Sequence, residues 1–326
     1  MFCSPESNPY LILKRNIHIL LLLFFCAGLK AQDPQFTQFY ANPLYLAPSF
    51  AGATQQHRLV TNYRNQWPSI PGAFQTYSFS YDHYFENFNS GLGVIAMSDV
   101  AGSANLSLTS LGIAYSYDFL VTNLLHIRPG LQFSYVMSGL DFSKLIFSAP
   151  TEIPPVESTG DIDASSSVLV YTERYWGGFS VDHMLTPNQS FYADEALIPV
   201  KLSVFGGAQI IKQGRLLKPV DETVTLAFLF RSQAHYKQLD LGLYWNKQPV
   251  VFGLWYRGIP PFNGPRGDAL AMLVGYKTRQ LSIGYSYDFT VSNLVTSTGG
   301  AHEISLVYQF RTQKRKRPHA VPCPEF

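Results

Sequence analysis

The sequence has little charge and little cysteine. Asp, Glu, Lys and Arg make up 14% of the 326 residues, against roughly 25% in ordinary soluble domains. Beyond residue 31 the sequence has a single cysteine, Cys323, so neither an internal disulfide nor a cysteine metal cluster is expected there. The formal net charge of +2 is small, which argues against nucleic acid as a partner.

Long apolar runs and catalytic signatures are also missing after residue 31. No stretch approaches the ~18 consecutive apolar residues of a transmembrane helix. The motifs GxSxG, HExxH, GxxxxGK[ST] and CxxC do not occur. The neighbours Asp82-His83 and Asp182-His183 would point to opposite faces of a strand, so their spacing does not make a dyad. We therefore predict no enzyme, no cofactor and no metal site.

Residues 1–31 have the pattern of an export signal. Lys14 and Arg15 supply positive charge before an almost unbroken apolar run from Ile17 to Leu29. That run is short for a membrane-spanning helix, which needs ~20 apolar residues. Cleavage is expected before Gln32, so the processed chain would be exported.

Aromatic residues are abundant, at 15% of the chain, and many recur at every second position. In the stretch LSIGYSYDF (281–289) the large side chains share one face, and the small or polar ones share the other. HEISLVYQF (302–310) repeats this alternation. A period of two indicates β-strands. A soluble sandwich could show it too, but an end on Tyr308 and Phe310 favours the aromatic rim of a transmembrane barrel.

Similar runs recur along the chain, and they predict a closed barrel. They cover 58–67, 74–85, 91–98, 107–119, 124–137, a weak run near 165–171, 174–184, 200–211, 222–231, 234–245, 249–257, 268–277, 279–289 and 302–310. This gives about 14 strands, within a range of roughly 12 to 16, since even numbers are the rule for such barrels. The prediction is an all-β, antiparallel outer-membrane β-barrel over residues 58–310. Inside the run 124–137, Pro129 predicts a bulge or two separate pieces.

The connections predict the orientation of the barrel. The longer ones, at 138–167, 185–199, 258–267 and 290–301, are expected on the outer side, and the short turns on the periplasmic side. An even strand number then places both termini in the periplasm.

Residues 32–57 carry three prolines and no sustained alternation, which argues against a central strand. One interpretation is a coil before the first strand. The other is a segment folded into the lumen or onto the periplasmic mouth, and its many aromatic residues favour that docked form.

Residues 311–326 form a basic tail that is rich in proline, so it is not a membrane strand. It is a solvated segment, a clamp on anionic lipid head groups, or a docking peptide for a periplasmic partner. The candidate partner-docking residues at the two ends of the chain are Phe36, Phe39, Tyr40, Asn42, Pro43, Lys314, Arg315, Lys316 and Arg317.

Several short motifs, in order along the chain, resemble those of one known family. They are QDPQFTQFYANPL (32–44), YRNQW (63–67), TYSFSYD (76–82), RYWGGFS (174–180), WYR (255–257), GYSYD (284–288), GAHEISL (300–306) and the ending CPEF (323–326). Together they look like the PorP/SprF family, and the resemblance covers nearly the whole exported chain.

The resemblance implies a non-enzymatic outer-membrane component of the type IX secretion system. Its expected partners are outer-membrane lipid, a secreted cargo protein with a C-terminal sorting domain, such as a gliding adhesin, and a periplasmic peptidoglycan-binding lipoprotein. The expected role is secretion or surface anchoring of that cargo. The alternatives are a passive porin or small-ligand uptake channel and, less favoured for want of a site, an outer-membrane enzyme.

Overall fold

The computed structural model describes residues 33–38, 41–102, 105–122, 124–141, 156–191, 195–214, 220–258, 267–290 and 299–310. The chain divides into Met1–Asp33 and Pro34–Phe326, and the fold below is that of the second unit. The predicted signal and the basic tail lie outside the described residues. Within the described ranges, no helix combines the length and hydropathy that a membrane span requires.

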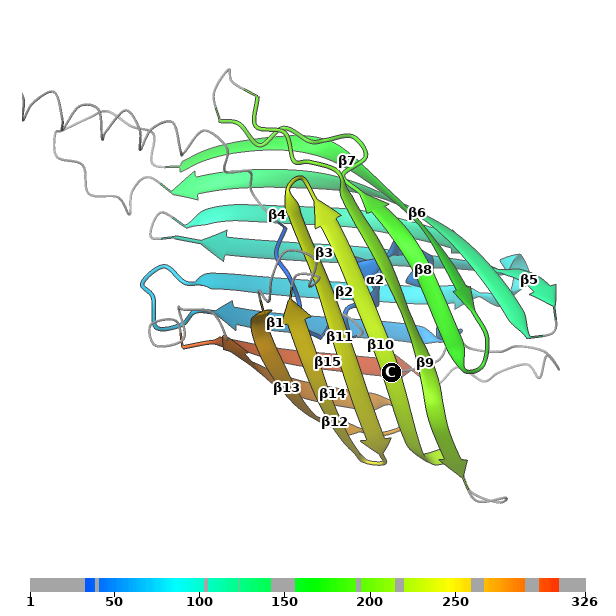
Figure 1. The fold of residues 1–326 in the computed structure, drawn as a ribbon. Helices are drawn as coiled ribbons and strands as arrows, with labels where there is room; N and C mark the ends of the chain where they lie inside the picture. The colour runs from blue at the N-terminus through cyan, green and yellow to red at the C-terminus, as the bar shows by residue number, and fades with distance from the viewer. Residues whose placement is uncertain are drawn as a thin grey trace, which may run out of the picture. The chain divides into compact units, whose positions relative to one another are not determined.

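Fifteen β-strands form one antiparallel sheet (Figure 1). They are β1 (His57–Gln66), β2 (Phe74–Phe85), β3 (Ser90–Ala101), β4 (Leu106–Tyr117), β5 (Phe119–Thr122), β6 (Leu125–Asp141), β7 (Val156–Tyr171), β8 (Tyr175–Asp182), β9 (Lys201–Gly214), β10 (Val220–Gln233), β11 (Tyr236–Lys247), β12 (Val250–Gly258), β13 (Gly267–Lys277), β14 (Leu281–Thr290) and β15 (Ala301–Phe310). Two 3-10 turns and one short helix complete the described elements: η2 (Pro48–Phe50), η3 (Glu86–Phe88) and α2 (Pro43–Leu46).

The sheet closes on itself. Strand β15 pairs with β1 along its full length, and β4 pairs with β6. Strand β5 follows β4 after one residue and pairs with the same neighbour, β6, so β4 and β5 act as one interrupted strand. The result is a closed barrel of fourteen strands, as predicted. A closed ring leaves no open sheet edge, which is what a membrane-spanning sheet requires.

The two faces of the wall differ as the alternation predicts. Tyr285 and Ile304 point outward and are 44% and 49% exposed, whereas Ser286 and Glu303 point inward and are fully buried. The same split of large apolar side chains outside and small or polar side chains inside recurs on β2 and β4. An outer band of this kind suits hydrocarbon contact.

The connections are of unequal length at the two ends of the barrel. The longest connections are those after β6, β8, β12 and β14. Because the strands alternate in direction, these four connections all lie at the same end of the barrel, here called the long-loop end. The opposite, short-turn end carries the turns after β2, β5, β7, β11 and β13, together with the start of β1 and the end of β15. The grouping of the long connections agrees with the prediction, and their outward orientation in the membrane stays a prediction.

One predicted loop is partly wrong. Residues 138–167 were expected to be irregular, but β6 continues to Asp141 and β7 begins at Val156. Strand β7 carries Asp163, Ser165 and Ser167 on its buried inner face. Its composition therefore resembles a loop, although the polar side chains line the lumen of a regular strand.

The prediction for Pro129 also needs correction. Strand β6 runs through it without a register shift against β7, where Pro129 faces Val168. The interruption falls on the other neighbour instead: pairing with β4 ends at Gly130, and pairing with β5 resumes at Ile127. Proline has no N–H to donate. The interruption therefore falls between β4 and β5, on the side of β6 where a hydrogen bond from residue 129 would have been accepted.

Candidate functional site

The segment before β1 folds inside the barrel, and its described residues between 34 and 56 are called the plug below. Pro43 begins the single turn of α2, and Pro48 begins η2. Proline suits a first helical position because its φ is already helical and its missing N–H has no partner there. Leu44 and Phe50 are almost completely buried. The described part of this segment is therefore packed inside the barrel.

Hydrogen bonds attach the plug to inward side chains on distant strands. The Asn42 side-chain amide donates to the Ser78 hydroxyl on β2 at 2.9 Å. The backbone N–H of Ser49 donates to the Ser167 hydroxyl on β7 at 2.8 Å. These strands face different parts of the lumen, and α2 lies within the ring of strands in Figure 1. The plug is therefore bound to the wall on several sides.

Two inward glycines allow the plug to approach the wall closely. A Cβ on Gly91 of β3 would lie 1.8 Å from the carbonyl oxygen of Ala51. A Cβ on Gly130 of β6 would lie 2.3 Å from the backbone nitrogen of Ser49. Any side chain at either position would displace the plug backbone, so glycine here reflects close backbone contact.

The plug runs along the axis of the lumen. Its first part is at Thr37, whose hydroxyl donates to Asp288 at 2.7 Å, near the long-loop end of β14. Its last part is at Gly52, whose N–H donates to Asp82 at 2.7 Å, near the short-turn end of β2. The chain thus passes from the long-loop half of the lumen to the short-turn end, where β1 begins.

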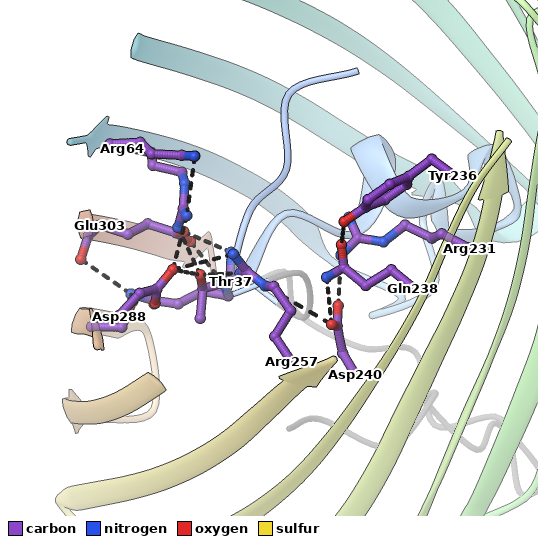
Figure 2. Close-up of polar contacts among 12 residues, drawn as sticks. Thr37, Arg64, Arg231, Tyr236, Gln238, Asp240, Arg257, Asp288 and Glu303 are labelled. Carbon is purple, nitrogen blue, oxygen red and sulfur yellow. Dashed lines mark hydrogen bonds and ion pairs between the residues drawn. The ribbon is translucent and has the colours of Figure 1, made fainter. Parts of the chain in front are cut away.

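Buried charges surround the first part of the plug (Figure 2). Arg64 of β1 pairs with Asp288 at 2.8 Å and with Glu303 of β15 at 3.1 Å. The Glu303 carboxylate also accepts the backbone N–H groups of Thr37, at 2.7 Å, and Gln38, at 2.9 Å. One carboxylate thus joins the plug to both strands of the seam where the ring closes.

The buried charges continue along the wall. Arg257 of β12 lies 3.4 Å from Asp288 and 3.9 Å from Asp240 of β11, and Asp240 pairs with Arg231 of β10 at 2.6 Å. The Thr37 hydroxyl accepts hydrogen bonds from Arg64 and Arg257 and donates one to Asp288. These three bonds use the full hydrogen-bonding capacity of the hydroxyl. The charged cluster consists of Arg64, Arg231, Arg257, Asp240, Asp288 and Glu303. Its three cations and three anions balance, as buried charges must.

A second polar set holds the end of the plug near the short-turn end. Arg128 of β6 pairs with Asp118 at 3.2 Å and donates to the carbonyl oxygen of Ala51. Arg58 of β1 donates to the carbonyl oxygen of Phe50 at 3.0 Å. These guanidinium groups satisfy plug carbonyls that have no strand partner.

One side of the plug packs against an apolar patch of the wall on β7 to β13. Phe50 of the plug packs against Trp176 of β8 and Phe205 of β9, with ring centroids 6.5 Å and 5.6 Å apart. All three side chains are at most 4% exposed. The buried cluster around them comprises Leu46, Ala47, Phe50, Ala53, Leu169, Tyr171, Trp176, Phe205, Ala227, Leu229, Tyr244, Val251, Trp255, Ala271 and Leu273. The plug is thus packed into the barrel as part of its core.

The predicted docking residues divide into two groups. Phe36, Asn42 and Pro43 are buried in the plug, where Phe36 packs on Tyr45 with ring centroids 5.2 Å apart. Phe39, Tyr40, Lys314, Arg315, Lys316 and Arg317 lie outside the described residues. The charged cluster was not among the predicted residues. Its signal in the sequence is a charge at an inward position of an alternating strand, as at Asp288 in GYSYD.

The adjacent acid–histidine pairs do not form dyads. Asp82 faces inward and pairs with Arg58 at 2.8 Å, whereas His83 stacks on His57 with ring centroids 3.7 Å apart. In the other pair Asp182 pairs with Lys201 at 3.4 Å, and His183 contacts Asp163 of β7 at 2.7 Å. This agrees with the prediction that the members of each pair act independently.

A family model described as "Type IX secretion system membrane protein PorP/SprF" matches residues 28–308. A comparison with curated proteins found no match. Among solved structures, the barrel is similar to the Ralstonia pickettii toluene transporter TbuX, with a TM-score of 0.53, 10% identity, and coverage of 83% of this chain and 93% of that one. That likeness supports the fold.

Two further neighbours are more distant. The P. putida toluene transporter TodX gives a TM-score of 0.46 at 9% identity, over 82% of this chain and 93% of that one. The Acinetobacter baumannii outer membrane protein Omp33 gives a TM-score of 0.45 at 8% identity, over 79% of this chain and 100% of that one.

Proposed function

The chain belongs to the PorP/SprF family of type IX secretion system membrane proteins, and we propose that it is a non-enzymatic platform that retains a secreted cargo at the outer membrane. The observation that supports this role most directly is the occupied lumen. A plug fixed by buried charges and aromatic packing closes the space that a passive porin would keep filled with water. The cargo, in this proposal, contacts the long-loop end through a C-terminal sorting domain.

The short-turn end is the proposed meeting point with the periplasmic lipoprotein. Phe36, Asn42 and Pro43 are buried against the barrel, so they contribute by holding the plug. Direct contact then falls to the basic tail, with Lys314, Arg315, Lys316 and Arg317 as its cations. Strand β15 ends at the short-turn end, which supports the proposal that the tail acts on that side. Both termini are proposed to be periplasmic.

Affinity purification from detergent-solubilised membranes tests the partner proposal. The full chain is expected to recover one peptidoglycan-binding lipoprotein and one large secreted protein. Deletion of residues 311–326 is expected to lose the lipoprotein while the barrel still inserts. A variant with the four basic residues changed to glutamine separates charge from length. Unchanged recovery of the lipoprotein with both variants would contradict docking by the tail.

The channel alternative has its own test. Recording in planar bilayers is expected to give little or no steady conductance for the intact protein, because the plug fills the lumen. A variant lacking residues 34–54 is the matched comparison and is expected to conduct more. Robust open conductance of the intact protein, together with normal cargo display when the barrel is blocked, would favour a channel.

A further inference from the structure

A pocket remains inside the barrel between the plug and the wall formed by β12 to β15 and β1. Its cavity volume is about 90 Å³. On the plug side its walls include Pro43, Phe50 and Ala53, and on the barrel side Val251 and Leu273. The described residues around the pocket are thus mainly apolar, with polar groups at a few positions. This combination is typical of sites that bind small molecules.

The sequence produces this hollow through paired small residues. Gly275 of β13 and Gly284 of β14 face each other in the sheet, and both line the pocket. A Cβ on Gly275 would meet no atom closer than 3.1 Å, so the space there is open. Beside Gly284 the space is taken by Gln38 of the plug, whose side-chain oxygen would lie 2.6 Å from an added Cβ. The plug presents Ala41 and Ala53 on its side of the pocket. The hollow is therefore encoded by both of its walls.

One polar group in the pocket lacks a partner. Thr54 of the plug is 6% exposed and lines the pocket, and its buried hydroxyl has no hydrogen-bond partner among the described residues. An unsatisfied buried hydroxyl is unfavourable, so rotation of the Thr54 side chain toward a ligand in the pocket would remove that cost.

The ionisable side chains around the pocket indicate the sign of a ligand's charge. Among the described residues that line it, the ionisable groups include the cations Arg58 and Lys277 and no carboxylate. Arg58 is paired with Asp82 of the neighbouring strand β2. An anionic or hydrogen-bond-accepting head group is therefore favoured over a cationic one.

We propose that this pocket binds a small amphiphile with an alkyl body and a carboxylate head. The alkyl body contacts the apolar walls around Phe50 and Leu273. The head group accepts a hydrogen bond from the Thr54 hydroxyl and lies near the cations. A cavity of about 90 Å³ is smaller than the ~150 Å³ cavity known to hold benzene, so the enclosed part is a short chain of about four carbons.

The position of the pocket indicates how a ligand reaches it. Lys277 ends β13, Ser282 is near the start of β14, and Gln309 is near the end of β15. All three line the pocket and lie at the short-turn end of their strands. A ligand is therefore expected to arrive from that end, without passing the charged cluster around Thr37. The proposed site is thus independent of cargo binding at the long loops.

A homologous series of carboxylates tests the proposal. Acetate, butyrate, hexanoate and octanoate are added to the full barrel in nanodiscs, and binding is followed by saturation-transfer NMR. Nanodiscs avoid detergent, whose alkyl chains would compete. Affinity is expected to rise by roughly fourfold for each added methylene until the pocket is filled, and then to level off. Empty nanodiscs give the background from partition into lipid.

Two variants assign the signal to the pocket. Thr54→Val keeps the shape, removes the hydroxyl and is expected to weaken binding about tenfold. Gly275→Leu fills the hollow and is expected to abolish binding, with circular dichroism to confirm the fold. Thr61→Val, on the exposed outer face of β1, is the matched control. A signal equal to that of empty nanodiscs, or equal binding by Thr54→Val and the unmodified chain, would overturn the proposal. The first result would mean that only water occupies the pocket.

Discussion

Glu303 is the side chain whose loss should release the first part of the plug. Its carboxylate is completely buried, pairs with Arg64 at 3.1 Å and accepts two backbone N–H groups of the plug. Glu303→Gln removes the charge but keeps the shape and one acceptor. Breaking one partner of a buried ion pair costs about 3–5 kcal/mol. The lower value corresponds to roughly a hundredfold rise in the population with the plug locally released.

Cysteine labelling measures that population. Ala41 in the plug is 4% exposed and carries no polar contact through its side chain, so Ala41→Cys is a suitable reporter in a Cys323→Ser background. When the plug opens and closes faster than the cysteine is labelled, the labelling rate with a membrane-impermeant maleimide is proportional to the equilibrium constant for opening. The rate is expected to rise about a hundredfold in Glu303→Gln. Glu86→Gln, in the turn η3, is the control and should match the parent.

Two results would refute this reasoning. One is a labelling rate in Glu303→Gln within about threefold of the parent, which would mean that the aromatic packing alone holds the plug. The other comes from Arg64→Gln combined with Glu303→Gln. Because the pair is buried, the double variant is expected to cost less than the sum of the two single changes. Strict additivity would show that the two side chains do not act together.

Three other substitutions test the plug and the wall. Gly130→Val is expected to displace the plug, since its Cβ would lie 2.3 Å from the backbone nitrogen of Ser49, and conductance in planar bilayers should rise. Phe50→Ala removes the aromatic contact with Trp176 and should destabilise the barrel by about 3–5 kcal/mol, measured by the temperature at which the folded band is lost on gels. Leu254→Arg places a charge on the outer face, where Leu254 is 45% exposed, and should cost about 2–4 kcal/mol in guanidinium unfolding from liposomes, whereas Leu254→Met should cost little.

The barrel itself could be predicted because each strand carries its own signal. Side chains of a strand alternate in direction, so GYSYD shows its outer tyrosines and inner serine without any knowledge of neighbouring strands. The same reasoning failed for β7, since Asp163 and Ser165 face inward on a strand whose outer side is only weakly apolar. A strand lined with such residues is hard to distinguish from a polar loop when its neighbours are unknown.

The contacts in the lumen could not be predicted, because they depend on which strands meet across the ring. Arg64 and Glu303 are far apart in the sequence and become neighbours only when β1 pairs with β15, where they face each other. Alternation placed Asp288 on the inner face, but it gave no information about its partner. Pairing across a closed ring is set by register, which a single sequence does not specify.

The position of the charged cluster has a consequence for how the barrel closes. The plug precedes β1, yet Thr37 and Gln38 bind Glu303 on the final strand. The pairing of β1 with β15 also brings Arg64 to the same carboxylate. If the ring closed first, the buried carboxylate would lack its two backbone partners, and the plug would have to enter a barrel that had already closed. The plug is therefore expected to be in place before β15 joins β1, so that the final strand pair and the plug stabilise each other.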